Sequence, residues 1–504
     1  MADKTWAGGT SDDAAVAGNW SPSGVPASND KVEIPDASTT SNDCRLTTAT
    51  SWGTLTIATD GILVGNGQTL TLNGGVNDGG TAADYNYTDA GQTSNVSGSL
   101  DIVMRNLRSS GDRAIITAAA NNIRNLKIDD FTADGGGTGK VYHFQCNLTI
   151  SGDLTVEYGD LNTAFSSTSY ELIVAGTTTI GPASGAADQA TLTCNASTVS
   201  LGTTRQQGDY ALNIEQGGTF VGGTGTHTVG SLYMAQSANA KATMTTAVMT
   251  INGYNNSANK AWRVEYGGDT FDNANGTVRF NFNGFDTRMS MRSESHANNA
   301  FHNLIIQMNG DTRTLSIDNG TDVKVDNDLT VSRGVLNAGS NHNLEVVGHV
   351  DVGTDSEVSN LKFTSTSTKT ATFKSILIGA NGTYEATSGT TTLKGEHTNG
   401  FAWYNNGTFT DNDGTVTIGD GSTSIGTTHI QENRFHHLTI NRDAENVNTV
   451  WRDVSGNTLT IDGNLTMTKG FFYRNTVTDT LTVTGDVDIA ANGRLGLTAD
   501  TGAN

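Results

Sequence analysis

The sequence repeats one short unit of strand and turn four times. Each copy has two glycine positions seven residues apart, and the second glycine is followed by a run rich in Thr and Val. Three copies start with Gly-Thr and an aromatic residue, whereas the fourth has Asp269 in place of the first glycine. The copies occupy residues 218–229, 269–280, 382–393 and 407–418. A unit of glycine turns and short strands at fixed spacing predicts a stacked repeat architecture.

A larger duplication surrounds these units. The segment Phe301-His302-Asn303-Leu304 matches Phe435-His436-His437-Leu438, and further matches keep an offset of 134 to 138 residues. A partial third copy lies earlier in the chain. Each copy contributes a pair of leucines that we expect to point into a common core, since each is followed two residues later by an apolar residue. These leucines are Leu126, Leu154, Leu304, Leu329, Leu438 and Leu465.

Composition narrows the fold class. Sixty glycines and only four prolines in 504 residues suit short strands joined by tight turns. Segments such as Leu459-Thr460-Ile461 alternate apolar and polar residues, which predicts one buried and one solvated face. Matching positions recur at intervals of 25 residues, as in Gly382 and Gly407. The sequence therefore predicts an all-β, elongated β-solenoid resembling a parallel β-helix, with an array of small β-sandwich modules as the alternative.

Four segments are expected along the chain. Residues 1–50 form a capping or attachment segment, 51–270 the first solenoid part, 271–410 a repeat module, and 411–504 a second repeat module with the C-terminal end. No proline-rich linker or charge block separates them. The three cysteines, Cys44, Cys146 and Cys194, lack CxxC spacing and are expected to be unpaired and mostly buried thiols.

The charge and the N-terminus limit the partners. A formal net charge of −22 with scattered basic residues argues against a nucleic-acid partner, because phosphate binding needs clustered Lys and Arg. No apolar run is long enough for a membrane span, and the first residues lack the apolar core of a secretory signal. We therefore expect neither membrane insertion nor export by a signal peptide.

The N-terminal segment contains a pattern of Trp, Gly and Pro residues that resembles a known class of proteins. Trp6, Gly18-Asn19-Trp20-Ser21, Gly24-Val25-Pro26 and Asp30-Lys31-Val32-Glu33-Ile34 resemble the entry segment of extended β-helical proteins, both bacterial adhesins and virion-associated proteins of bacteriophages. Adhesins of this kind carry an export signal, so the resemblance implies a phage virion protein made in the host cytoplasm. It implies a fibre, spike or head appendage that assembles with other virion proteins and with copies of itself. The alternatives are a tailspike that binds or degrades host glycan, and a bacterial surface adhesin or filament protein.

The sequence contains no recognised catalytic motif, and we predict that the protein is not an enzyme. The sequence has no GxSxG, HExxH, P-loop or dinucleotide-binding motif, so no catalytic or cofactor-binding residue is assigned. Carboxylate pairs such as Asp129 with Asp130, Glu157 with Asp160, and Asp411 with Asp413 could in principle hydrolyse glycan, but with 51 acidic residues such pairs arise by chance. Asp411-Asn412-Asp413-Gly414 is similar to part of a calcium loop but lacks the EF-hand spacing, and we predict an inter-strand turn. His436 matches His302 and is expected to be structural, so no metal site is assigned.

Aromatic residues supply the remaining candidates. Trp6, Trp20 and Pro26 are expected to cap the solenoid or attach it to the particle, because an open coil edge must be covered. A second group of aromatic residues lies next to polar or cationic ones and is a candidate for glycan contact, with filling of the coils as the competing role. This group is Trp262, Tyr266, Trp403, Tyr404 and Trp451.

Overall fold

The chain is built almost wholly of short strands that stack as successive coils. The computed structural model describes residues 2–73, 87–89, 92–94, 99–105, 113–117, 122–130, 141–183, 189–203, 208–264, 270–291, 299–318, 322–422, 426–445, 447–451, 458–474 and 479–496. The chain divides into two compact units, Met1–Ala274 and Asn275–Asn504. The only helices in the described residues are two 3₁₀ turns, η1 (Ala17–Asn19) and η2 (Ala37–Thr39), and neither is long or apolar enough to cross a membrane.

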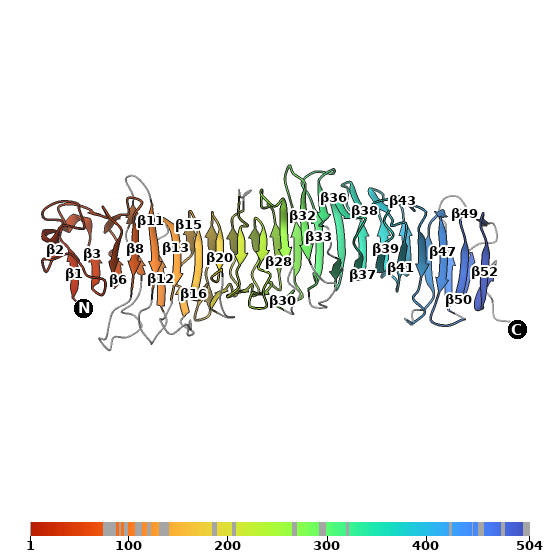
Figure 1. The fold of residues 1–504 in the computed structure, drawn as a ribbon, viewed down its shortest axis with the longest axis horizontal. Coiled ribbons are helices and arrows are strands. Elements are labelled where there is room, and N and C mark those ends of the chain that lie inside the picture. The colour runs from red at the N-terminus through yellow and green to blue at the C-terminus, as the bar shows by residue number, and fades with distance from the viewer. Residues whose placement is uncertain are drawn as a thin grey trace. The chain divides into compact units, whose positions relative to one another are not determined.

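In the first unit, strands that lie next to one another in space belong to successive coils (Figure 1). One stack contains β1 (Asp3–Trp6), β3 (Lys31–Ile34), β6 (Thr54–Ile57), β9 (Tyr87–Asp89), β12 (Arg113–Thr117), β14 (Val141–Phe144), the second part of β16 (Leu154–Asn162), β21 (Ala190–Thr193), β24 (Gly218–Val221), β27 (Lys241–Thr243) and β30 (Phe271–Asp272).

A second stack of the first unit contains β5 (Thr50–Trp52), β8 (Thr69–Leu72), β11 (Leu100–Met104), β13 (Ile123–Asp129), the first part of β16, β20 (Thr178–Ile180), β23 (Leu212–Ile214), β26 (Leu232–Met234) and β29 (Lys260–Val264). Other strands form the sheet of β4 (Cys44–Arg45), β7 (Ile62–Val64) and β10 (Gln92–Ser94), and the stack of β15 (Leu148–Ile150), β19 (Leu172–Val174), β22 (Val199–Leu201), β25 (His227–Val229) and β28 (Val248–Ile251). The short strands β2 (Trp20–Ser21), β17 (Ala164–Phe165) and β18 (Thr168–Ser169) lie outside the stacks.

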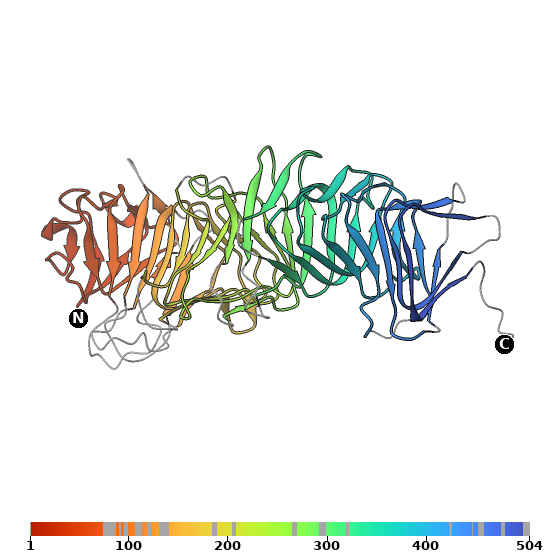
Figure 2. The same ribbon diagram turned by 45° about the vertical axis from the view of Figure 1, so that its right-hand side comes forward.

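The second unit has the same plan (Figure 2). One stack contains β31 (Thr277–Phe280), β33 (Asn303–Gln307), the first part of β36 (Leu329–Gly339), the second parts of β37 (Leu344–Val352) and β39 (Thr370–Ile378), β42 (Phe401–Asn405), β45 (Thr428–Gln431), β48 (Asn448–Trp451) and the second part of β50 (Leu465–Arg474). Another contains β35 (Val323–Val325), the first parts of β37 and β39, β41 (Thr390–Leu393), β44 (Thr415–Ile418), β47 (His437–Asn441), and the first parts of β50 and β52 (Val487–Gly496).

The remaining strands of the second unit complete its coils. One stack contains β32 (Thr287–Met291), β34 (Thr314–Ile317), the second part of β36, β38 (Ser359–Phe363), β40 (Gly382–Glu385) and β43 (Thr408–Thr410). The strands β46 (Arg434–Phe435), β49 (Thr458–Ile461) and β51 (Thr480–Val483) form a three-stranded sheet.

Parallel pairing between successive coils confirms the predicted β-solenoid. Among the paired strands described, only β1 with β2 and β17 with β18 run antiparallel. The six predicted core leucines are all at most 1% exposed. They also pair with one another across coils: Leu126 with Leu154, Leu304 with Leu329, and Leu438 with Leu465. Such in-register parallel ladders exclude the alternative of β-sandwich modules, whose sheets are antiparallel.

Two glycines of the short repeat, Gly389 and Gly414, occupy equivalent turns in successive coils. Gly389 and Gly414 directly precede strands β41 and β44, which pair as Thr390 with Thr415. Neither glycine has a positive φ, and the left-handed backbone before Gly414 falls at Asn412 (φ 46°) and Asp413 (φ 58°). Glycine is needed at 389 because a Cβ would lie 2.6 Å from the carbonyl oxygens of Thr368 and Lys369 in the preceding coil.

Candidate functional site

The tryptophans predicted to contact glycan lie in the core instead. Trp262 and Trp403 are fully buried and Trp451 is 1% exposed. Trp403 and Trp451 flank Ile430 in consecutive coils, so their rings belong to the inward ladder of the second unit. A buried indole offers no face to a sugar ring, and the competing role of filling the coils is the one that the structure supports. Tyr266 lies outside the described residues.

One acidic residue, Glu432, accepts hydrogen bonds from two of these indoles. Glu432 is 6% exposed, and its Oε2 accepts hydrogen bonds from Trp403 Nε1 (3.0 Å) and Asn405 Nδ2 (2.9 Å). Its main-chain carbonyl accepts a bond from Trp451 Nε1 (2.9 Å). Burial raises the pKa of the Glu432 carboxyl, and the surrounding N–H donors oppose that effect. Sequence reasoning missed Glu432, because nothing near it in the sequence marks it as the partner of two distant tryptophans.

A polar cavity of about 450 Å³ opens beside Glu432. It is lined by Asn405, Asn406, Gly407, Thr408, Phe409, Asp411, Gln431, Glu432, Asn433 and Arg434. Two of the lining amides are held in place, since Gln431 Nε2 donates to Oδ1 of the exposed Asn406 (2.8 Å) and Asn406 Nδ2 donates to the half-buried Tyr404 hydroxyl (3.0 Å). Asn433 and Arg434 are exposed. The cavity thus presents side chains that both donate and accept hydrogen bonds.

The half-buried Phe409 contributes an aromatic ring to this cavity. It stacks on Tyr384 at an interplanar angle of 17°, and the edge-to-face contact with Trp403 places the ring centroids 4.6 Å apart. These contacts fix the orientation of the Phe409 ring.

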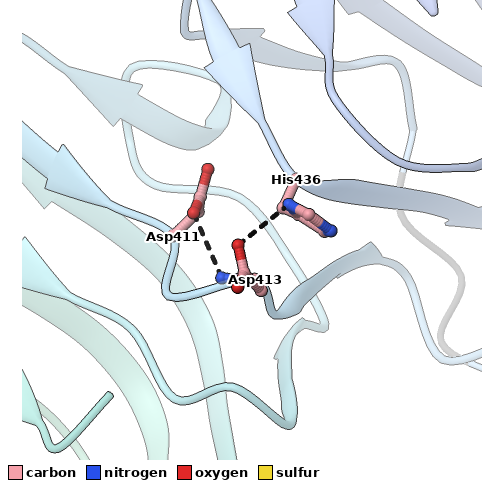
Figure 3. Close-up of side chains that lie close together, drawn as sticks. All are labelled: Asp411, Asp413 and His436. Carbon is pink, nitrogen blue, oxygen red and sulfur yellow. Dashed lines mark hydrogen bonds and ion pairs between the residues drawn. The ribbon is translucent and has the colours of Figure 1, made fainter. Parts of the chain in front are cut away.

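Next to the cavity, Asp411, Asp413 and His436 converge (Figure 3). Their candidate ligand atoms all lie within 4.8 Å of one another, and His436 Nδ1 is 3.2 Å from Asp413 Oδ1. The two acids belong to the predicted turn before β44, where the amide of Asp413 donates to Asp411 Oδ1 (3.2 Å). His436 precedes β47, in the next coil.

Backbone hydrogen bonds hold this turn and His436 opposite one another. The Gly414 amide donates to the Asp411 carbonyl (2.9 Å), and the His437 amide donates to the Gly414 carbonyl (3.1 Å). His437 points elsewhere, since its Nδ1 accepts a hydrogen bond from the Asn464 amide (2.8 Å). Burial, with His436 nearby, lowers the pKa of His437. The expected turn is present, and it brings together two carboxylates and an imidazole that the sequence did not assign to one site.

The N-terminal candidates lie in a folded cap on the first coils. Trp6 and Trp20 are 1% and 3% exposed, with their ring centroids 5.0 Å apart, and Trp20 in turn contacts Trp52. Trp6 Nε1 donates to the Asn42 carbonyl (2.8 Å) and Trp20 Nε1 to the Ala14 carbonyl (2.9 Å). Pro26 is also buried. These contacts bury both indoles within the chain itself.

One acid of each of the other two pairs, Asp129 and Glu157, belongs to an ion-pair ladder. Asp129 contacts Arg105 (2.8 Å) and Lys127 (3.8 Å), and Lys127 also pairs with Glu157. The basic partners engage the Asp129 and Glu157 carboxylates, which suits a structural ladder across coils.

A serine also lies beside a histidine, and none of the three cysteines forms a disulfide. The Ser375 hydroxyl lies 2.7 Å from His349 Nδ1, but Ser375 is fully buried and inaccessible to a substrate. Cys44 and Cys194 are buried and Cys146 is half-buried, as expected. Burial raises the pKa of the Cys44 and Cys194 thiols, which disfavours the reactive thiolate.

Comparison with known proteins adds no relative to this picture. No family model, curated protein or solved structure matches the chain. A functional conclusion therefore has to come from the solenoid and from the side chains gathered around Glu432 and His436.

Proposed function

We propose that this chain is a non-enzymatic structural protein of a bacteriophage particle, a fibre, spike or head appendage that presents a rigid β rod. The observation that carries the proposal is the in-register parallel pairing of successive coils, exemplified by Leu438 with Leu465. Each coil donates its backbone hydrogen bonds to its neighbours, so the stack resists bending while its turns remain free to vary. Rigidity of this kind is what an appendage needs to hold a surface away from a particle.

The chemistry around the strands supports a structural role. Of the acids named as candidates for glycan hydrolysis, Asp129 and Glu157 are ion-paired, and Ser375, which contacts His349, is buried. The N-terminal cap covers its own indoles, which leaves its outer surface, including the 45% exposed Val25, available for docking. Assembly with other virion proteins and with further copies of the chain belongs to this proposal.

Peptide mass spectrometry of purified particles, with gold-labelled antibody in electron micrographs, tests this function. The expected result is a fixed copy number per particle and label at one position. Absence of the chain from particles that are otherwise complete would reject the proposal.

The polar cavity favours a second candidate function, binding of host glycan. Its amides, the Thr408 hydroxyl and the fixed Phe409 ring offer hydrogen bonds and an apolar face to a sugar. Binding of host-surface oligosaccharides by the purified chain, measured by calorimetry, should weaken in Asn433→Ala and Phe409→Ala. Release of reducing ends from the same oligosaccharides would instead favour a glycan-degrading tailspike.

A further inference from the structure

We propose that Asp411, Asp413 and His436 form a binding site for a divalent transition-metal cation, with Zn²⁺ the best match. The inference goes beyond the proposed function, and it holds or fails on the purified chain alone. It rests on the spacing of the three side chains, their attachment to two successive coils, and a comparison with the earlier copy of the same turn.

The spacing is that of ligands around one small cation. Two ligands about 2.0 to 2.1 Å from a tetrahedral Zn²⁺ lie roughly 3.4 Å from each other. His436 Nδ1 and Asp413 Oδ1 are 3.2 Å apart, and an Asp411 oxygen completes a group that lies within 4.8 Å. Small rotations of the side chains would bring all three atoms to bonding distance from one centre.

The backbone fixes both halves of the site before any cation binds. Strands β44 and β47 pair with Thr415 opposite His437, which sets the turn before β44 against the residue before β47. The left-handed residues Asn412 and Asp413 shape the turn, and Asn412 Nδ2 anchors it to the Ala386 carbonyl (2.7 Å). A cation held here would cross-link two successive coils.

The donor set selects the class of cation. One imidazole nitrogen and two carboxylates suit Zn²⁺ and its transition-metal neighbours, whereas Ca²⁺ and Mg²⁺ prefer oxygen ligands alone. Three protein ligands leave a further coordination position for water or another molecule. Asp411 also lines the polar cavity of about 450 Å³, so that position has room beside it.

The earlier copy of the turn shows that its shape does not require the acids. There, Thr277 pairs with Asn303 as Thr415 pairs with His437, so His302 is the counterpart of His436. The positions of Asp411 and Asp413 are taken by Asn273 and Asn275. The backbone keeps the same left-handed pair, with φ 52° at Ala274 and 57° at Asn275. Two carboxylates beside an imidazole are therefore a property of this copy and not of the turn.

The test is calorimetric titration of the chelator-treated full chain with ZnCl₂ at neutral pH, compared with Asp413→Asn and His436→Asn. We expect saturable binding of Zn²⁺ at this site and a loss of affinity of at least about tenfold in each variant. Asp413→Asn recreates the residue found at Asn275, so its fold should persist, and circular dichroism without metal verifies this. His302→Asn, the matched control, should bind Zn²⁺ as the parent does.

Several results would overturn the proposal. One is the absence of saturable Zn²⁺ binding up to about 1 mM, which would leave His436 and Asp413 as an ion pair only. Another is equal affinity in the parent, Asp413→Asn and His436→Asn. A third is binding of CaCl₂ that is tighter than that of ZnCl₂ and insensitive to His436→Asn, since that would describe an all-oxygen site.

Discussion

At the scale of single residues, buried polar groups form hydrogen bonds between residues of neighbouring coils. Glu432 is the clearest case, because its carboxylate and its carbonyl receive the indole N–H groups of Trp403 and Trp451. The tryptophans that were candidates for glycan contact thus point into the core, and the polar cavity beside them is lined by amides, a hydroxyl and charged groups.

Glu432→Gln tests this arrangement. Both carboxylate oxygens accept hydrogen bonds, Oε2 from Trp403 and Asn405 and Oε1 from the Asn433 amide. In either orientation the NH₂ group of Gln would face N–H donors and leave them without an acceptor, so we expect a loss of about 1 to 3 kcal/mol in the free energy of unfolding. Denaturant unfolding measures it. Glu385→Gln is the control, since half-buried Glu385 accepts a bond from Asn360 at the surface and should change stability by less than about 0.5 kcal/mol. Equal effects of the two changes would contradict the role of Glu432.

His227 predicts a pH dependence of stability. Burial lowers its pKa from 6.5 to about 4, and the side chain is 2% exposed. Above pH 6.5 it is neutral in both the folded and the unfolded chain. As the pH falls from 6.5 towards 4, the unfolded chain takes up the proton first, so stability is lost across that window, by roughly 3 kcal/mol in total.

The melting temperature of the parent and of His227→Leu, measured from pH 7 to pH 4, checks this expectation. Between pH 7 and pH 4, the melting temperature of His227→Leu should fall less than that of the parent. His302→Leu, at a half-buried position, should keep the decline of the parent. If the melting temperatures of the parent and of His227→Leu fall in parallel with pH, His227 does not cause the loss of stability.

At the scale of elements, the long strands turn corners in the same way in all three copies of the larger repeat. Pairing skips one residue in β16, β36 and β50, at Glu157, Ser332 and Thr468. Two residues later each strand has a glycine with positive φ, at Gly159 (88°), Gly334 (86°) and Gly470 (103°). A bulge followed by a left-handed glycine redirects the strand from one stack to the next.

Substitution of a corner glycine should therefore be costly. In Gly334→Ala the alanine must adopt a positive φ and its Cβ would lie 2.7 Å from Met308 Cγ, so we expect the free energy of unfolding to fall by about 1 to 2 kcal/mol or more. Gly426→Ala in the same unit has no atom within 4 Å and should be close to neutral. Thermal unfolding of both variants is the measurement, and similar melting temperatures would show that the corner does not depend on glycine.

At the scale of the whole molecule, the N-terminal segment has two separable roles. Its indoles cap the first coils, while the exposed Val25 beside Pro26 belongs to the surface that we propose docks to the particle. Deletion of residues 1–40 removes β1, β2 and β3 together and leaves one edge of β6 unpaired, so it affects capping and docking at once. Point changes separate them better.

Trp20→Ala and Val25→Asp make that separation. Trp20→Ala should lower stability by about 3 to 5 kcal/mol, as loss of a buried tryptophan does. Val25→Asp should leave the melting temperature unchanged and reduce the copy number on particles from a complemented mutant, counted by quantitative mass spectrometry. Normal incorporation of Val25→Asp would place the docking surface elsewhere and leave the segment as a cap.

The sequence by itself determined the fold class and much of the register. Glycine spacing and alternating apolar residues depend on neighbours in the chain, and they correctly predicted the solenoid, the buried leucines and the turn at Asp411-Asn412-Asp413-Gly414. Only the tertiary structure decided which way Trp403 and Trp451 face. It also decided that Glu432 joins them and that His436 meets Asp413, because coil stacking alone brings together residues about twenty or more positions apart.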